Sequence, residues 1–310
     1  MKKIVSIFAA LLAFAVILFA PLAASAQENN SAEWIRVQSD DGEFSIEVPM
    51  NYHFMVDKTG FSTASSSNNY KLEDMKMLNA YQDKTLISFE SYKAKKGALE
   101  AVRDTENNRG KFSEIKLDGV SIKQVIEKTD EFYLVKQYFN SKNRIYILIA
   151  ASRKEESPAI KRFLNSLIFK PQDKSDTAIN RIANSISFSN LKISQIEIDK
   201  SPEPVKKSNI TAIAPPPTVD PNVLPIMILS KPRASYTDAA RMNGEKGTVQ
   251  VRLAFSQEGY ISKAGFLKTL NFGLTRQAFF AALRIKFLPT EKDGKPETVT
   301  KLVEYSFDIY

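Results

Sequence analysis

A proline-rich segment divides this 310-residue chain. Seven prolines fall between Pro202 and Pro225, and three of them are consecutive, at Pro215, Pro216 and Pro217. Proline has no backbone N–H and holds φ at about −65°, so such a stretch fits neither the interior of a helix nor that of a sheet and extends as polyproline II. We therefore predict a linker over residues 171–225, with its extended part at these prolines and a folded domain on either side.

The first 26 residues have the layout of a secretory signal. Lys2 and Lys3 precede a long apolar run, residues 4–20, and a small-residue site ends at Ala26. We expect cleavage after Ala26 and export of the mature chain. An uncleaved anchor in the inner membrane is the alternative, because about 17 to 20 apolar residues can just span a bilayer.

The composition argues against catalysis. The chain has no cysteine, which excludes disulfides, thiolate metal sites and a cysteine nucleophile. Its one histidine, His53, lies between aromatic residues and is interpreted as a packed loop residue rather than as a base or ligand. The net charge of +8 comes from scattered basic residues, without a cluster typical of nucleic-acid binding. We expect no catalytic residue, no metal ion, no cofactor and no nucleic-acid partner.

Residues 27–170 are predicted to form an α+β domain. Alternating or apolar runs predict strands at residues 34–37, 44–48, 75–81, 85–92, 119–127, 131–139 and 144–152, and helices over residues 98–108 and from Pro158. Many antiparallel strands with two helices favour an antiparallel α/β sandwich. The last strand is apolar on both faces at residues 145–149, which predicts a central position in its sheet.

Two motifs of this domain loosely resemble those of PsbP-like domains. They are Gly-x-Phe-Ser-Ile-x-Val-Pro at residues 42–49 and Arg-Phe-Leu-x-Ser-Leu-x-Phe at residues 162–169. The resemblance implies a non-catalytic binding or assembly module. In the linker that follows, residues 193–198 alternate like a strand, and the pattern leaves open whether this piece docks on a neighbouring domain.

Residues 226–310 carry the most regular pattern of the chain. From Gly247 onward, apolar and polar residues alternate in a strand that ends at a turn around Gly259. A returning strand, a helix over residues 273–286 with a stripe of small alanines, and a final alternating strand follow. The physical pattern is therefore strand, strand, helix, strand, the order β-β-α-β.

This C-terminal pattern resembles the C-terminal domain of TonB-type energy transducers. The order of motif residues carries the resemblance, and its main members are Pro232, Tyr236, Gly247, Gly259, Phe287 and Pro289. One departure is Thr237, which stands where the family usually has proline and leaves the local turn in question.

The resemblance implies binding by strand addition. In the family, the last strand is an open sheet edge that pairs with an extended segment of an outer-membrane TonB-dependent receptor during energy-dependent transmembrane transport. The corresponding edge here is residues 299–310. The implied partner-binding residues are Val299, Lys301, Val303, Tyr305 and Phe307. The alternatives are that this strand only completes its sheet, or that it pairs with a second copy in a homodimer.

The N-terminus differs from that of the family's transducers. Their inner-membrane anchor carries a serine and a histidine, four residues apart, that work with ExbB and ExbD, whereas the apolar segment here has Ser6 and no histidine. Two interpretations therefore stay open. The chain is a periplasmic TonB-like transport component, with ExbB/ExbD-like partners if an anchor is kept. Otherwise it is a soluble periplasmic binding or scaffold protein that uses the TonB-like domain only for docking.

Overall fold

The computed structural model describes residues 33–58, 61–64, 69–94, 97–104, 111–170, 176–199 and 222–308. The predicted signal with its cleavage site at Ala26 lies outside these residues, as do most of the prolines between 202 and 225 and the last two residues of the chain. From Glu33 onward the chain belongs to one compact unit, so contacts between its N-terminal and C-terminal domains belong to a single body. None of the described helices is long and apolar enough to cross a membrane.

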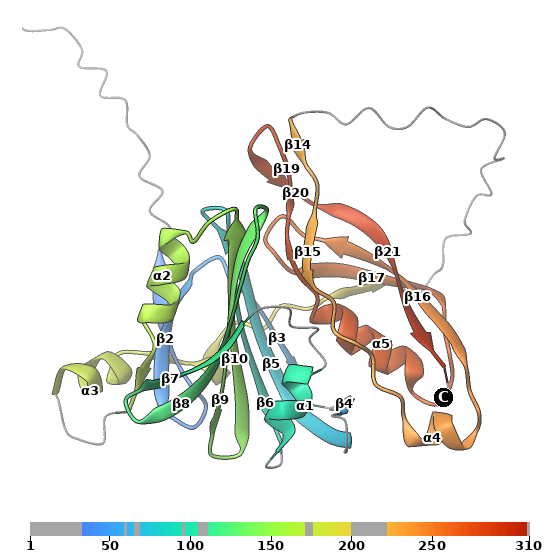
Figure 1. Ribbon diagram of the computed structural model, residues 1–310, viewed down its shortest axis with the longest axis horizontal. Helices are drawn as coiled ribbons and strands as arrows, with labels where there is room; N and C mark the ends of the chain where they lie inside the picture. The colour runs from blue at the N-terminus through green and yellow to red at the C-terminus, as the bar shows by residue number, and fades with distance from the viewer. Residues whose placement is uncertain are drawn as a thin grey trace, which may run out of the picture. The chain divides into compact units, whose positions relative to one another are not determined.

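The N-terminal domain contains two sheets (Figure 1). The first has the order β11-β2-β1-β12, with β11 (Ile168–Phe169), β2 (Phe44–Pro49), β1 (Trp34–Gln38) and β12 (Ile186–Ser187). The second has the order β3-β5-β6-β10-β9-β8-β7, with β3 (His53–Asp57), β5 (Asn69–Gln82), β6 (Thr85–Lys93), β10 (Arg144–Arg153), β9 (Phe132–Ser141), β8 (Val120–Lys128) and β7 (Lys111–Leu117). The strand β4 (Phe61–Ala64) pairs with β5. All strand pairs described in these two sheets are antiparallel except β1 with β12.

The helices of this domain are α1 (Ala98–Asp104), α2 (Pro158–Asn165) and α3 (Asp176–Ala183), with a 3-10 turn η1 (Phe188–Asn190). Ser157 begins α2 because its hydroxyl accepts a hydrogen bond from the Ile160 backbone N–H, and Pro158 occupies the first turn. The buried face of α2, with Ile160 and Phe163, joins one apolar cluster with inward-facing residues of both sheets. The predicted α+β sandwich is therefore confirmed.

The C-terminal domain is built around an α5 helix and a sheet of order β13-β17-β16-β21. Its elements are β14 (Val223–Leu224), β15 (Met227–Ser230), α4 (Asp238–Met242), β16 (Gly247–Phe255), β17 (Ile261–Lys268), α5 (Leu274–Leu283), β18 (Lys286–Leu288), β19 (Thr290–Lys292), β20 (Lys295–Glu297) and β21 (Val299–Phe307). The predicted strand, strand, helix, strand order corresponds to β16, β17, α5 and β21. The short strands and α4 are additions that the alternation did not predict.

Part of the predicted linker is folded. Residues 176–199 contain α3, β12 and η1, and end in β13 (Glu197–Asp199). β12 adds in parallel to β1 of the N-terminal domain, whereas β13 adds in parallel to β17 of the C-terminal domain. The piece that alternates at residues 193–198 contacts both domains, because Ile193 forms a bridge with Phe54 of β3 and the piece runs into β13. Apart from Pro225, the later part with its polyproline prediction falls on residues that the structure does not describe.

The strand β10 is central in its sheet, as predicted, between β6 and β9. Its even-numbered residues, including Tyr146 and Leu148, face the sandwich core, whereas Ile147 and Ile149 join the apolar cluster that contains α5 and Phe287 of the C-terminal domain. The two domains therefore share an apolar core rather than standing apart.

Candidate docking site at the last strand

The strand β21 forms one edge of the C-terminal sheet (Figure 1). All nine of its residues pair in antiparallel register with β16, from Gly247 opposite Phe307 to Phe255 opposite Val299. Among the described residues β21 pairs with no other strand. Its second side therefore presents backbone N–H and C=O groups that another extended segment could bind.

The five residues predicted to bind a partner lie on one face of β21. Tyr305 and Phe307 are buried, at 5% and 2% exposure, Val299 and Val303 are half-buried, and Lys301 is exposed. Burial raises the pKa of the Tyr305 hydroxyl above its usual range, so this side chain stays neutral. The structure thus places Tyr305 and Phe307 in the domain core, where their side chains stabilise the strand instead of meeting a partner.

The opposite face of β21 is open to solvent. Thr300, Leu302, Glu304 and Ser306 are exposed, and Leu302 is an apolar side chain with 51% exposure. The Gln250 side chain donates a 2.6 Å hydrogen bond to Glu304 Oε1 on this face. Sequence reasoning missed these four residues because it selected the apolar half of the alternation, which is the half that the core requires.

A contact from Lys231 indicates how the β21 backbone is oriented. Its ammonium donates a 2.8 Å hydrogen bond to the backbone carbonyl of Glu304, and it lies 4.9 Å from the centre of the Tyr305 ring. Lys231 follows β15, outside the sheet, so the Glu304 carbonyl faces away from β16. In an antiparallel strand the N–H and C=O of one residue face the same side. The even-numbered residues of β21, including Leu302, therefore direct their backbone groups to the open edge.

The family-motif residues hold this domain together. The Tyr236 ring packs edge-on against Phe307 at 5.7 Å, and its hydroxyl donates to the Glu245 carbonyl. Phe287 packs edge-on against Phe255 at 4.9 Å. The role of these aromatic residues is structural, because each packs against a core residue of the sheet.

The other motif residues lie at bends and boundaries. Pro232 is buried beside β15, and the carbonyl of Pro289 accepts a 2.9 Å hydrogen bond from Arg153 of the N-terminal domain. Gly247 and Gly259 have φ of +137° and +83°, where a side chain would strain the backbone. The structure thus places all six motif residues in packed parts of the domain or at its bends, with none on the open edge of β21.

The departure at Thr237 has a local explanation. Thr237 begins α4, since its hydroxyl accepts a 3.1 Å hydrogen bond from the Ala240 N–H. The same hydroxyl donates a 2.7 Å hydrogen bond to the Phe272 carbonyl. Proline could make neither bond, so threonine at this position caps the helix and ties it to the loop before α5.

The histidine His53 lies in a strand and not in a loop, which corrects the prediction. It begins β3 and stacks on Tyr260 of the C-terminal domain, with ring centres 3.5 Å apart and planes at 5°. Burial lowers the pKa of His53 to about 4. Within the described residues, no group of three or more histidine, aspartate or glutamate side chains is arranged to hold a metal ion.

Together, the β-β-α-β order and the open last strand define an α+β domain with an unpaired sheet edge, the kind of edge that strand addition uses. Residues 232–309 match the family model described as Gram-negative bacterial TonB protein C-terminal. The C-terminal part of the chain is therefore a TonB C-terminal domain, as its motif predicted. No curated protein matches the chain. The resemblance of the N-terminal domain to PsbP-like domains stays a prediction.

Proposed function

We propose that this protein is a TonB-like component of energy-dependent transmembrane transport that docks on an outer-membrane receptor by strand addition at β21. One observation carries the proposal, namely the open side of β21 in a TonB C-terminal domain. An incoming segment would form main-chain hydrogen bonds with the outward N–H and C=O groups of Leu302 and Glu304. Selectivity would come from the exposed side chains of the even-numbered residues.

The N-terminal domain is compatible with this docking. It contacts the C-terminal domain through α5 and β18, whereas Leu302 remains exposed on β21. A receptor segment therefore reaches the edge without separating the two domains. The obstacle is Lys231, whose ammonium would have to leave the Glu304 carbonyl before a peptide N–H could take its place.

The proposed compartment is the periplasm, reached through cleavage after Ala26. The Gram-negative family of the C-terminal domain and the signal-like first 26 residues support this location. ExbB/ExbD-like partners are proposed only for a form that keeps residues 1–26 in the inner membrane. N-terminal sequencing of the native protein separates the two forms, because a start at Gln27 in a soluble fraction would reject membrane-coupled transduction.

The second candidate function is a soluble periplasmic binding or scaffold protein whose TonB-like domain serves only for docking. The apolar core shared by Ile147 and Phe287 favours it, since the C-terminal domain is fixed to a globular partner domain rather than carried by a spacer alone. Both candidates exclude a catalytic role, and the family is a non-enzymatic protein-interaction domain. Self-pairing of β21 in a homodimer remains an outcome of the test below.

The edge is tested by photo-crosslinking in the source bacterium. A p-benzoylphenylalanine at Leu302 should form an adduct that mass spectrometry identifies as an outer-membrane receptor, cross-linked through an extended segment. The same group at Glu131, an exposed position of the N-terminal domain, is the control. If the adduct joined two copies of the chain, β21 would pair with itself and the proposal of receptor docking would be wrong. A yield no higher than at Glu131 would show that β21 is not a docking edge.

A proline substitution tests the backbone directly. Leu302→Pro removes an N–H that faces the open edge and leaves the ladder to β16 intact, so a cross-linker at Ser306 should lose its receptor adduct. Leu302→Val keeps the N–H and should retain the adduct. An unchanged adduct in a folded Leu302→Pro variant would show that binding does not use this edge.

A further inference from the structure

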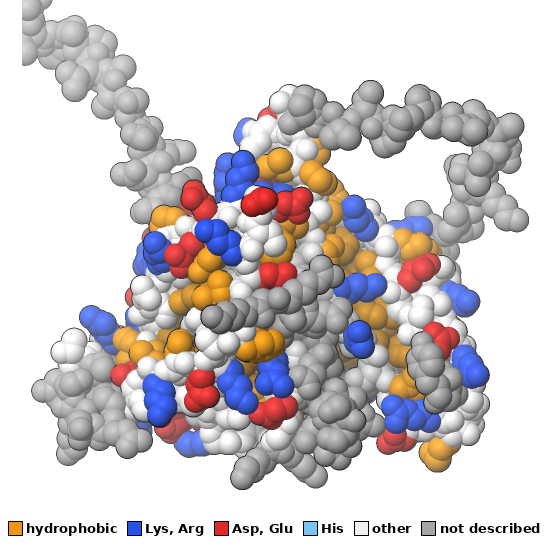
Figure 2. Space-filling model, viewed as in Figure 1, with side chains coloured by type: hydrophobic (Ala, Val, Ile, Leu, Met, Phe, Trp, Pro, Cys, Tyr) orange, Lys and Arg blue, Asp and Glu red, His pale blue; other side chains and the backbone are white. Residues whose placement is uncertain are grey.

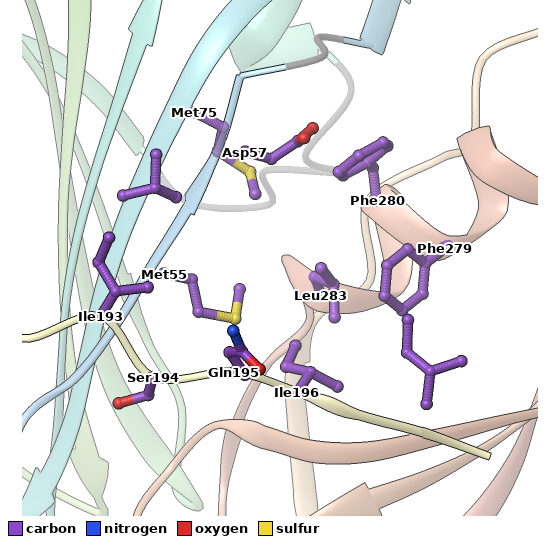
Figure 3. A pocket seen from close by; sticks show the side chains of 12 residues that line it. Met55, Asp57, Met75, Ile193, Ser194, Gln195, Ile196, Phe279, Phe280 and Leu283 are labelled. Atoms are coloured by element: carbon purple, nitrogen blue, oxygen red, sulfur yellow. The ribbon is translucent and has the colours of Figure 1, made fainter.

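A cavity of about 360 Å³ lies between the two domains, next to β13, which is the edge of the C-terminal sheet opposite β21. Figure 3 shows Met55 and Met75 on one side of the open space, and Phe279, Phe280 and Leu283 of α5 facing them. Its volume falls within the range of about 300 to 1,000 Å³ that is typical of small-molecule sites, which occur preferentially at domain interfaces.

Residues 193–198, here called the strap, form the third wall. The Ser194 N–H donates a 2.7 Å hydrogen bond to the Phe54 carbonyl, which fixes one end of the strap to β3. At the other end, Ile198 lies opposite Ala264 in the β13 and β17 pair. Ile196 faces the cavity between these two attachments (Figure 3). The cavity is therefore bounded by β3 and β5, by α5 and by the strap.

The strap also presents apolar surface to solvent. Ile193 is 56% exposed and Ile198 is 46% exposed, and both line the cavity. Burial of such side chains is favourable by roughly 25 cal/mol for each Å² removed from water. A molecule seated against the strap would cover part of both and would contact the buried side chains of Met55 and Met75. The unbranched methionine side chains adapt to irregular shapes, which suits a ligand rather than a close-packed core.

The charged residues at the cavity disfavour an anionic ligand. Among the described residues that line the cavity, Asp57 is the only ionisable one, and the Arg276 guanidinium lies 3.9 Å from its carboxylate. No lysine or arginine stands among those described lining residues to bind a carboxylate or a phosphate, and an anion would meet Asp57 instead. The Gln195 amide lies toward the cavity (Figure 3) and supplies a donor and an acceptor for one neutral polar end.

We propose that this cavity binds a neutral, predominantly apolar small molecule with a single hydrogen-bonding end. The ligand contacts β3 of the N-terminal domain and α5 of the C-terminal domain at once, so its binding stabilises the docked arrangement of the two by mass action. The site is separate from the β21 edge, and it is tested without a receptor.

The test uses N-phenyl-1-naphthylamine, a neutral apolar fluorophore, with the purified chain. We expect a saturable rise in fluorescence at one probe per chain and a higher melting temperature at saturating probe. Dodecanoate, an anion with an apolar chain, should compete poorly, and 1-dodecanol should compete well. Absence of saturable binding, or better competition by dodecanoate than by 1-dodecanol, would overturn the proposal.

Two variants locate the bound probe. Ile196→Trp fills the cavity from the strap and should weaken binding at least about tenfold, equivalent to about 1.4 kcal/mol. Gln195→Trp starts from an exposed side chain, so it tests the same wall if Ile196→Trp does not fold. Met242→Trp is the control, because Met242 is 82% exposed on α4 and does not line the cavity. Equal affinities for the Met242 variant and a folded strap variant would refute the site.

Discussion

Glu90 and Lys286 form an ion pair across the boundary between the two domains, with Glu90 Oε1 and Lys286 Nζ 2.6 Å apart. Glu90 has no exposed side-chain surface and Lys286 has 2%. The second carboxylate oxygen lies 3.3 Å from Arg284 Nε and accepts a hydrogen bond from Tyr92. The N-terminal sheet thus supplies one anion, and the TonB-like domain supplies two cations that bind it away from water.

Removal of the Glu90 charge should destabilise the chain strongly. In Glu90→Ala, two buried cations lose their anion, and breaking a buried ion pair in this way costs about 3–5 kcal/mol. The measurement is the free energy of unfolding in urea. Glu197→Gln is the control, because Glu197 pairs with Lys263 on the surface and exposed pairs contribute about 0–1 kcal/mol. Similar losses in both variants would contradict the role of the buried cluster.

The same cluster should make stability depend on acid pH. Burial by itself raises the pKa of Glu90, but the charges of Lys286 and Arg284, with hydrogen bonds from Lys286 and Tyr92, outweigh it and lower the pKa to about 2. A carboxyl whose pKa is lower in the folded state stabilises the fold above its unfolded pKa of about 4.5, and this contribution is lost as pH falls towards 2. In Glu90→Gln, the free energy of unfolding should decrease less than in the unsubstituted chain as pH falls from about 4.5 to about 2.

His53 should make the free energy of unfolding depend on pH between about 4 and 6.5. Burial lowers the pKa of His53 from 6.5 to about 4, so the folded chain binds fewer protons than the unfolded chain between these values. Stability should therefore be complete above pH 6.5 and fall as pH drops to about 4. Because the chain has one histidine, NMR titration reads its pKa without ambiguity. His53→Phe, which keeps a ring against Tyr260, should abolish the dependence in this window, and an NMR pKa near 6.5 would contradict it.

The strands of the C-terminal domain were predictable from the sequence, whereas the contacts between the two domains were not. Alternation located β16 and β21 because one face of each strand lies in the core of its own domain, whereas the turn around Gly259 located the returning strand β17. The apolar run in β10 indicated that both of its faces are covered, but it could not say that α5 covers one of them. The burial of Arg284 and Lys286 was not predictable, since their partner Glu90 lies far away in the sequence.

The docking edge was predictable only in part. The family pattern pointed to β21, and alternation separated its two faces. Which residues direct N–H and C=O groups outward depends on the register with β16 and on a contact from Lys231, and neither is visible in one sequence. The strap was ambiguous for the same reason, because a short alternating piece carries no information about which sheet it joins.

The turn at Gly259 packs closely against the N-terminal domain, and Gly294 provides a matched control for a substitution there. It has φ of +83°, and a Cβ there would lie 3.0 Å from side-chain atoms of both Leu86 and Tyr81. Gly294 has a similar φ of +75° with no atom within 4 Å of such a Cβ. Gly294→Ala should cost only the backbone strain, about 1–2 kcal/mol, whereas Gly259→Ala adds a clash with the N-terminal domain. Equal melting temperatures for the two variants would show that the turn is not held against Tyr81.

Lys231 should restrain the docking edge. Charged side chains, lysine above all, protect open edges from unwanted pairing, and Lys231 occupies an outward carbonyl of β21. Lys231→Ala frees the Glu304 carbonyl and removes a hydrogen bond worth about 0.5–1.5 kcal/mol that an incoming segment must otherwise displace. The cross-linking yield at Leu302 should rise, or self-association in sedimentation should increase. Lys301→Ala is the control, because Lys301 lies on β21 itself and does not take part in the contact of Lys231 with the Glu304 carbonyl. It should change neither the cross-linking yield nor self-association. A lower yield in Lys231→Ala would mean that the ammonium helps to bind the partner, and the edge would then be a charged recognition site rather than a protected one.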